Sequence, residues 1–220
     1  MAETVIFACP TLRYELEEAL REHSSRMRVE YLPQKLHSEP KEMHDYLQQK
    51  IDGLQDASRA VLCVSSCGGS TAGLLATKGE LVIPRTRDCL DILLSGNSLR
   101  DLERDLGGVY FTKGWMDFSR QSDLDLDKLT EKLGKAEAEA YLYEMYRTCN
   151  RFYIIDTGCY DVEEVRAYAV PLVRLADGTL TVIKGVYGIL RKIALGRFDE
   201  DFMVVPRGSR VSPEGFQKNW

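Results

Sequence analysis

Three cysteines stand where predicted strands end, and they are the residues whose type and position best suit chemistry. Cys9 ends the apolar segment 4–9, Cys67 follows the apolar segment 60–64, and Cys89 follows the run 81–83 after a proline. Ligands of open α/β sheets bind outside the carboxyl ends of the strands. If these strand ends converge, three thiolates can hold a zinc ion with an open fourth position or a three-cysteine iron–sulfur cluster.

The spacing alone leaves a second interpretation open, because the three cysteines form no Cys-x-x-Cys motif and cysteine also packs as a small hydrophobic residue. The other cysteines are expected to lie in the core, at a helix end or in a turn: Cys63, Cys149 and Cys159. The histidines lie at a helix end or in loops away from strand ends, and none is predicted to be a ligand: His23, His37 and His44.

The turn that begins at Cys67 offers a different kind of site. Gly68 and Gly69 allow backbone N–H groups to cradle an anion, although the segment is neither a P-loop nor a dinucleotide-binding fingerprint. Arg85 and Arg87 follow the next strand and can pair with a carboxylate or phosphate, or be ordinary solvated charges. An anion site at this turn is therefore the alternative to a metal site.

Strands and amphipathic helices alternate along the chain, which predicts an α/β fold with parallel sheets and right-handed crossovers. The predicted strands are 4–9, 28–32, 60–64, 81–83, 107–114, 152–155, 181–184 and 202–205. The predicted helices are 11–23, 40–54, 88–94, 98–106, 123–148, 162–175 with its last turn doubtful because of Pro171, and 188–195.

The order of elements in segments 5–69 and 152–208 is the same, which suggests two Rossmann-like, three-layer halves with a ligand cleft at the carboxyl ends of the strands. In such a repeat, the turn 67–69 corresponds to 206–208. We therefore expect a first lobe over 1–122, and a helical arm with a second lobe over 123–220, unless the two form one continuous domain.

Bulk properties exclude some partners. The net charge of −5 disfavours nucleic acid, whose phosphates need a basic surface. No apolar run reaches the length of a membrane span, and the start of the chain does not resemble a signal peptide. We therefore expect a cytoplasmic protein with reduced cysteines.

Four segments, VIPRTRDCLDILLSG, YFTKGW, IDTG and IALGRFDEDFMVVPRGSRV, together resemble the prokaryotic domain-of-unknown-function family sixteen thirty-eight. The resemblance implies functional positions at Cys9, Cys67, Asp88, Cys89, Gly114, Trp115, Asp156 and Gly158. Two positions depart from the family pattern, which usually has histidine at Arg87 and proline at Lys113.

Members of this family are similar to companions of corrinoid-dependent methyltransferase systems. The resemblance implies a metal- or cluster-binding protein of one-carbon metabolism, with its site at the three cysteines. Arg87 and Asp88 would orient a ligand or substrate, and Asp156 would face the site from the second half. The alternative is a non-catalytic module with metal-free cysteines that binds a small anionic ligand or a corrinoid protein. Whether the protein is an enzyme stays open.

Overall fold

The computed structural model describes residues 3–56 and 58–216, which fold into two compact α/β units. The first unit combines the chain up to Leu102 with the segment from Val186 onward, and the second is Glu103–Gly185. These bounds differ from the lobes expected from the sequence, because the end of the chain returns to the first unit.

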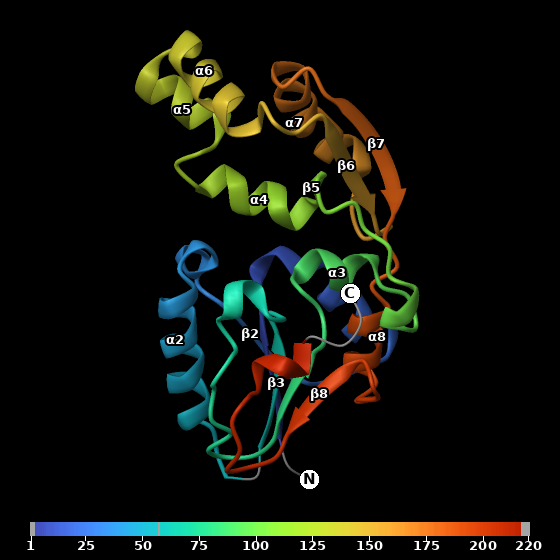
Figure 1. The fold of residues 1–220 in the computed structure, drawn as a ribbon. Coiled ribbons are helices and arrows are strands. Elements are labelled where there is room, and N and C mark those ends of the chain that lie inside the picture. Colours follow the sequence, from blue (N-terminus) through green and yellow to red (C-terminus); the bar gives the residue numbers. More distant parts are fainter. Residues whose placement is uncertain (1–2, 57, 217–220) are drawn as a thin grey trace. The chain divides into compact units, whose positions relative to one another are not determined.

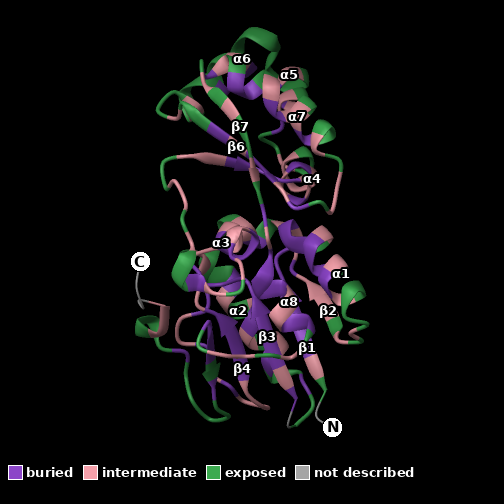
Figure 2. Ribbon diagram, turned by 90° about the vertical axis from the view of Figure 1, so that its right-hand side faces the viewer, coloured by how far each residue is buried: buried purple, intermediate pink, exposed green. Residues whose placement is uncertain are grey.

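The first unit is built on a five-stranded sheet with the order β2-β1-β3-β4-β8 (Figure 1). The bounds of its strands are β1 (Thr4–Ala8), β2 (Arg28–Tyr31), β3 (Arg59–Cys63), β4 (Leu81–Pro84) and β8 (Phe202–Val205). Strands β1 to β4 are parallel, and β8 is antiparallel to β4 with Val82 opposite Val204. The central strands are apolar along their length and buried, as the purple strands of Figure 2 show. This pattern is typical of a sheet covered on both faces.

The helices of this unit are α1 (Arg13–Glu22), α2 (Pro40–Asp52), α3 (Cys89–Leu94) and α8 (Gly188–Ala194). Figure 1 shows α2 and α8 on opposite sides of the sheet. The buried residues of α2 are Met43, Leu47 and Ile51, whose spacing of four places them on one helix face. Short 3₁₀ turns follow strands β1, β2 and β3, namely η1 (Pro10–Leu12), η2 (Gln34–Ser38) and η3 (Cys67–Gly69). Two more are η4 (Leu99–Asp101), which follows α3, and η5 (Pro213–Phe216), which comes after β8.

The second unit holds a three-stranded parallel sheet with the order β5-β6-β7. Its elements are β5 (Val109–Phe111), α4 (Lys113–Gln121), α5 (Leu126–Leu133), α6 (Lys135–Tyr146), β6 (Arg151–Asp156), α7 (Val162–Leu175) and β7 (Thr179–Lys184). Its core joins Phe111, Phe152 and Ile154 of the sheet to buried helix residues such as Leu142 and Val165. The α/β class with parallel sheets that the sequence predicts is confirmed.

Two predicted helices, 123–148 and 98–106, differ from the structure, whereas the helix predicted over 162–175 is confirmed to its last residue. Segment 123–148 is not one helix but breaks at Gly134, whose φ of 83° ends α5 and begins α6. Helix α7 continues through Pro171 to Leu175, because the exposed carbonyl of Ala167, which loses its helix donor there, can reach water. Segment 98–106 forms only the short turn η4.

The order of elements predicted for segments 5–69 and 152–208 is confirmed, but the inference that they form two separate halves is wrong. Strand β8 pairs with β4 in the first unit, so the turn 206–208 does not end a strand of a second Rossmann-like half. Within the described parts of the chain, no helix is long and apolar enough to cross a membrane.

Candidate functional site

The order of strands in the first sheet creates a topological switch point. The chain leaves β1 to form β2 on one side, then returns to form β3 on the other side of β1. Ligands of open α/β sheets bind at the carboxyl ends of such a strand pair. Cys9 directly follows β1, and Cys67 begins η3 after β3. Strand β4 lies beside β3 and leads to Cys89, so the predicted cysteines share one edge of the sheet.

Two of these cysteines influence each other's pKa. A side-chain hydrogen bond between Cys9 and Cys89 is the largest cause of the pKa shift of each. Thr11 joins them, since its Oγ1 lies 3.1 Å from the Sγ of Cys9 and it also hydrogen-bonds Cys89. Cys9 is buried and Cys89 is half-buried. The pair thus links the end of β1 to the first residue of α3.

This hydrogen bond shifts the pKa values of the two thiols in opposite directions. The Cys89 S–H donates to the sulfur of Cys9 and holds the pKa of Cys9 well below its usual value against the opposing effect of burial, and His37 and Thr11 lower it further. The same hydrogen bond, together with burial and the negative charge of Cys9, raises the pKa of Cys89. The titrations of the two thiols are therefore coupled.

Cys67 stands beside this pair in a backbone conformation that L-residues rarely adopt. Its φ is 31°, and Ser65, Gly68 and Gly69 also have positive φ. Such clustered strain is typical of functional sites. Burial first, and then the negative charges of Cys9 and Asp88, raise the pKa of Cys67 to about 11. Cys67 is thus within electrostatic reach of the thiol pair.

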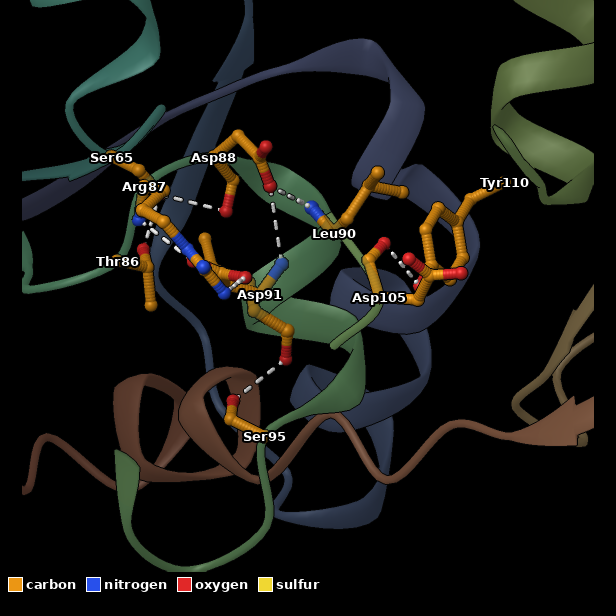
Figure 3. A network of polar contacts seen from close by, with 10 residues as sticks. Ser65, Thr86, Arg87, Asp88, Leu90, Asp91, Ser95, Asp105 and Tyr110 are labelled. Atoms are coloured by element: carbon orange, nitrogen blue, oxygen red, sulfur yellow. Dashed lines mark hydrogen bonds and ion pairs between the residues drawn. The ribbon is translucent and has the colours of Figure 1, made fainter. Parts of the chain in front are cut away.

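Hydrogen bonds connect the Cys67 turn to the segment that carries Cys89. The N–H of Cys67 donates to the carbonyl of Arg87 over 3.1 Å. The hydroxyl of Ser65 bonds both Thr86 Oγ1 and the carbonyl of Asp88 (Figure 3). The Asp88 carboxylate caps α3 by accepting from Leu90 N at 2.9 Å and from Asp91 N at 3.2 Å. As a result, the two segments that follow β3 and β4 form one connected unit.

Arg87 stabilises this unit through a buried carboxylate. Its guanidinium donates twice to Asp91, over 2.7 Å each, and its backbone N–H donates to the same carboxylate over 2.9 Å. Asp91 is fully buried. In this structure Arg87 therefore holds the backbone that positions Cys67 and Cys89.

The contacts of the glycine turn give no support to the anion interpretation. The N–H groups of Cys67, Gly69 and Ser70 donate to carbonyls of Arg87, Ser66 and Cys67. The guanidinium of Arg85 donates to the carbonyls of Phe202 and Gly215, and that of Arg87 to Asp91. An anion at this turn would have to break several of these bonds.

The remaining predicted residues belong to the second unit. Gly114 is buried in the first turn of α4, and Trp115 stacks on Phe118 with ring centroids 5.1 Å apart. The Asp156 carboxylate accepts the N–H of Gly158 over 2.9 Å, and Gly158 has a φ of 73°. Asp156 thus stabilises the turn after β6.

The prediction that His37 lies away from strand ends is wrong. His37 lies in η2, which follows β2, and its side chain hydrogen-bonds Cys9. Because β2 is the neighbour of β1, the segment after β2 lies beside the end of β1. The sequence signal that could have found this histidine is the end of the predicted strand 28–32, which the segment with His37 follows after a short loop.

The donor set suits a thiophilic metal. Among the residues that the structure describes, no three histidine, cysteine, aspartate or glutamate side chains are already arranged to hold a metal ion. Cysteine sulfur and imidazole nitrogen are nevertheless the ligands that zinc prefers, and Cys9, Cys89, Cys67 and His37 lie at neighbouring strand ends. Cys63 lies in the core as predicted, with no exposed surface.

Comparison with known proteins identifies the family but no activity. The family model described as "protein of unknown function (DUF1638)" matches residues 31–194, which include Cys67, Cys89 and His37 but not Cys9. No curated protein and no solved structure matches the chain. Because the match spans more than half of the 220 residues, the chain belongs to the DUF1638 family of proteins of unknown function.

Proposed function

We propose that the protein binds a thiophilic metal ion or a metal cluster through Cys9, Cys67 and Cys89, and that it serves one-carbon metabolism. The observation that carries the proposal is the hydrogen-bonded pair of Cys9 and Cys89 at the carboxyl edge of the first sheet. The lowered pKa of Cys9 favours the thiolate, which is the form of cysteine that a metal ion binds, because metal binding to thiols releases protons.

Cys67 and His37 extend the pair to a larger donor set. The negative charge of Cys9 raises the pKa of Cys67, and His37 hydrogen-bonds the Cys9 side chain. Three sulfurs and one imidazole are a ligand set for zinc, whereas three sulfurs alone also suit an iron–sulfur cluster. Once bound, zinc supplies Lewis-acid activation and a cluster supplies electrons.

The protein itself supplies the orientation of the ligands. The backbone bond from Cys67 to Arg87 and the Asp88 cap of α3 hold two ligand segments together. Thr11 hydrogen-bonds the sulfurs of both Cys9 and Cys89. Partners of this kind around a metal site tune its affinity, typically by about 10- to 100-fold.

Metal analysis of the full-length protein tests the proposal. After anaerobic purification, we expect elemental analysis and an absorption spectrum to show bound zinc or iron in the wild type. We expect Cys9→Ser and Cys89→Ser to lose the metal, while the matched controls Cys149→Ser and Cys159→Ser retain it. A wild-type protein that is metal-free and takes up neither added zinc nor added iron would refute the proposal.

The role in one-carbon metabolism rests on the family resemblance and needs its own test. We expect the metal-loaded wild type, and not the Cys9→Ser variant, to bind methylcobalamin in equilibrium dialysis or to change its absorption spectrum. If both proteins bind equally, the chain is a corrinoid-binding module whose cysteines are not involved. If neither interacts, the one-carbon assignment fails while the metal site stands.

A further inference from the structure

A pocket of about 360 Å³ lies in the first unit, between the C-terminal end of α1, the loop after α3, and helix α8 with the turn that follows it. Its volume is that of a site for a small molecule. Helix α1 starts soon after Cys9, and its ten residues span about 15 Å before His23, which lines the pocket. The pocket therefore lies at the opposite end of α1 from Cys9 and is separate from the candidate metal site.

One wall of the pocket depends on a close approach of two backbones. Gly188 begins α8, and its N–H donates to the carbonyl of Ser95 over 2.8 Å. A Cβ atom at this position would collide with the carbonyl oxygen of Gly96, so only glycine allows the approach. The preceding Tyr187 has a φ of 40°, which L-residues rarely adopt. The backbone of α8 is thus held directly against the loop that carries Asn97.

The turn after α8 places Arg197 at the pocket. The N–H of Arg197 donates to the carbonyl of Lys192, and the N–H of Gly196 donates to the carbonyl of Ile193, each over 2.9 Å. Gly196 has a φ of 66°. These two bonds around a left-handed glycine form a Schellman motif, which ends a helix and fixes the residue that follows. Arg197 is therefore held by its backbone, while its side chain is exposed to the pocket and to solvent.

Arg197 differs from the two other permanent cations that line the pocket. The Nε of Arg191 donates to the Glu22 carboxylate over 2.9 Å, and the Nζ of Lys192 donates to the Asp199 carboxylate over 2.7 Å. These ion pairs fix both side chains, and Asp199 is the carboxylate of the pocket lining. Within residues 3–56 and 58–216, the Arg197 side chain makes no hydrogen bond or ion pair. Arg197 thus gives the pocket a positive charge that no ion pair in this part of the chain neutralises.

We propose that this pocket binds a small organic anion through its phosphate or carboxylate group. The planar guanidinium of Arg197 presents a fork of N–H donors that matches either group. The amide of Asn97 adds two donors, and its side chain holds no hydrogen bond within the described residues. Leu195, which is 48% exposed, offers an apolar surface to the rest of the ligand. The pocket thus combines charge, oriented donors and apolar contact on a chain whose net charge is −5.

Titration of the isotope-labelled, full-length protein with phenyl phosphate and with benzoate tests the proposal. At constant ionic strength, we expect at least one of these probes to shift the NMR signals of the Gly188 and Gly196 amides. Arg197→Ala should weaken binding by about tenfold or more, because hydrogen bonds to charged groups are the strong ones. The matched control is Arg174→Ala, which removes an exposed arginine from the last turn of α7. It should bind the probes as the wild type does.

Several outcomes would overturn the proposal. Neither probe binding would do so, as would equal weakening in Arg197→Ala and Arg174→Ala, which would indicate an adventitious ion only. We expect phenyl phosphate to bind more tightly than inorganic phosphate, and Leu195→Ser to reduce this difference. Equal affinities in the wild type would rule out an organic ligand.

Chelator treatment separates this pocket from the metal site. Because the pocket lies at the other end of α1 from Cys9, we expect the affinity for the probes to be the same before and after chelation. Binding that disappears with the metal would place the anion on the metal and overturn the proposal. Binding by a protein that holds no metal would support the pocket even if the metal site fails.

Discussion

The carboxyl edges of the two sheets carry side chains with different partners. In the second unit, Thr112 after β5 accepts the N–H of Trp115 over 3.0 Å, and Asp156 at the end of β6 accepts the N–H of Gly158 over 2.9 Å. In the first unit, Cys9 after β1 reaches Cys89 after β4. The edge of the second sheet thus has polar side chains that cap their own turns, whereas the first has sulfurs that interact across strands. A strand end indicates chemistry when its side chain bonds to another strand end.

The same contrast separates two arginine–aspartate pairs. Arg87 pairs with Asp91 in the first unit, where the aspartate side chain has no exposed surface. Arg151 pairs with Asp105 in the second unit, where the side chains are 52% and 26% exposed. Both pairs are bidentate, and hydrogen bonding by Arg151 holds the pKa of Asp105 well below its usual value. The two arginine–aspartate pairs therefore share the same bidentate hydrogen bonding and differ in how far they are buried.

Removing the buried pair's arginine is expected to have the largest effect on stability. Arg87→Met removes both guanidinium bonds from the buried Asp91 carboxylate and keeps the bond from the backbone N–H of residue 87. Breaking a buried pair in this way typically costs about 3–5 kcal/mol. We expect urea unfolding followed by circular dichroism to show a loss of this size, and hydrogen exchange to increase in the segments of Cys67 and Cys89.

The matched substitution in the second unit is Arg151→Met. Asp105 there still accepts bonds from Gly107 N at 3.0 Å and from Tyr153 Oη at 3.0 Å, and water reaches both members of the pair. Tyr110 also remains bonded to the Asp105 carbonyl over 2.9 Å (Figure 3). Exposed ion pairs contribute little, so we expect a midpoint of unfolding close to that of the wild type. Equal losses in the two variants would remove the distinction between the pairs.

Several features of the fold could be predicted from the sequence because they depend on local pattern. Continuous apolar runs identified the strands, and their alternation with helices identified a parallel sheet. The pairing of β8 could not be predicted, since its pattern is the same for either sheet and either direction. Gly134 ends a helix because of its φ of 83°, and an isolated glycine in a helical segment does not reveal that angle.

The candidate site was predictable only in part. Strand-end position brought Cys9, Cys67 and Cys89 to one edge, but the sequence could not show which two sulfurs touch. His37 was missed because a loop of several residues separates it from β2. The partners of Arg87 were also hidden, since a solvated charge and a buried pair look the same in a sequence.

The pKa of Cys67 reports how strongly its thiol interacts with the negative charges of Cys9 and Asp88. Its folded pKa of about 11 lies above the value of about 8.5 for an unfolded cysteine, so the protonated thiol stabilises the fold. This contribution is present below the unfolded pKa and is lost as the pH rises toward about 11. We expect the stability of the wild type to fall more steeply over this range than that of Cys67→Ala.

The same pKa can be read directly from the pH dependence of alkylation at Cys67, mapped by mass spectrometry. Removing the negative charge of Cys9 or of Asp88 takes away one cause of the raised pKa. We therefore expect Cys9→Ser and Asp88→Asn to lower the pKa of Cys67, and asparagine still caps α3. An unchanged pKa in both variants would leave burial as its sole cause and would separate Cys67 from the pair.

The smallest expected effect comes from a helix cap that exists in both units. Asp125 caps α5 by accepting from Asp127 N at 3.2 Å and from Lys128 N at 3.4 Å, much as Asp88 caps α3. Asp125→Ala should cost about 1 kcal/mol in urea unfolding, because a lost N-cap leaves helix N–H groups unpaired. The neighbouring exposed Asp127→Ala should cost less. Since this cap holds no strand-end sulfur, we expect metal uptake to be unchanged in Asp125→Ala, whereas Asp88→Ala should weaken it by loosening the helix that begins with Cys89.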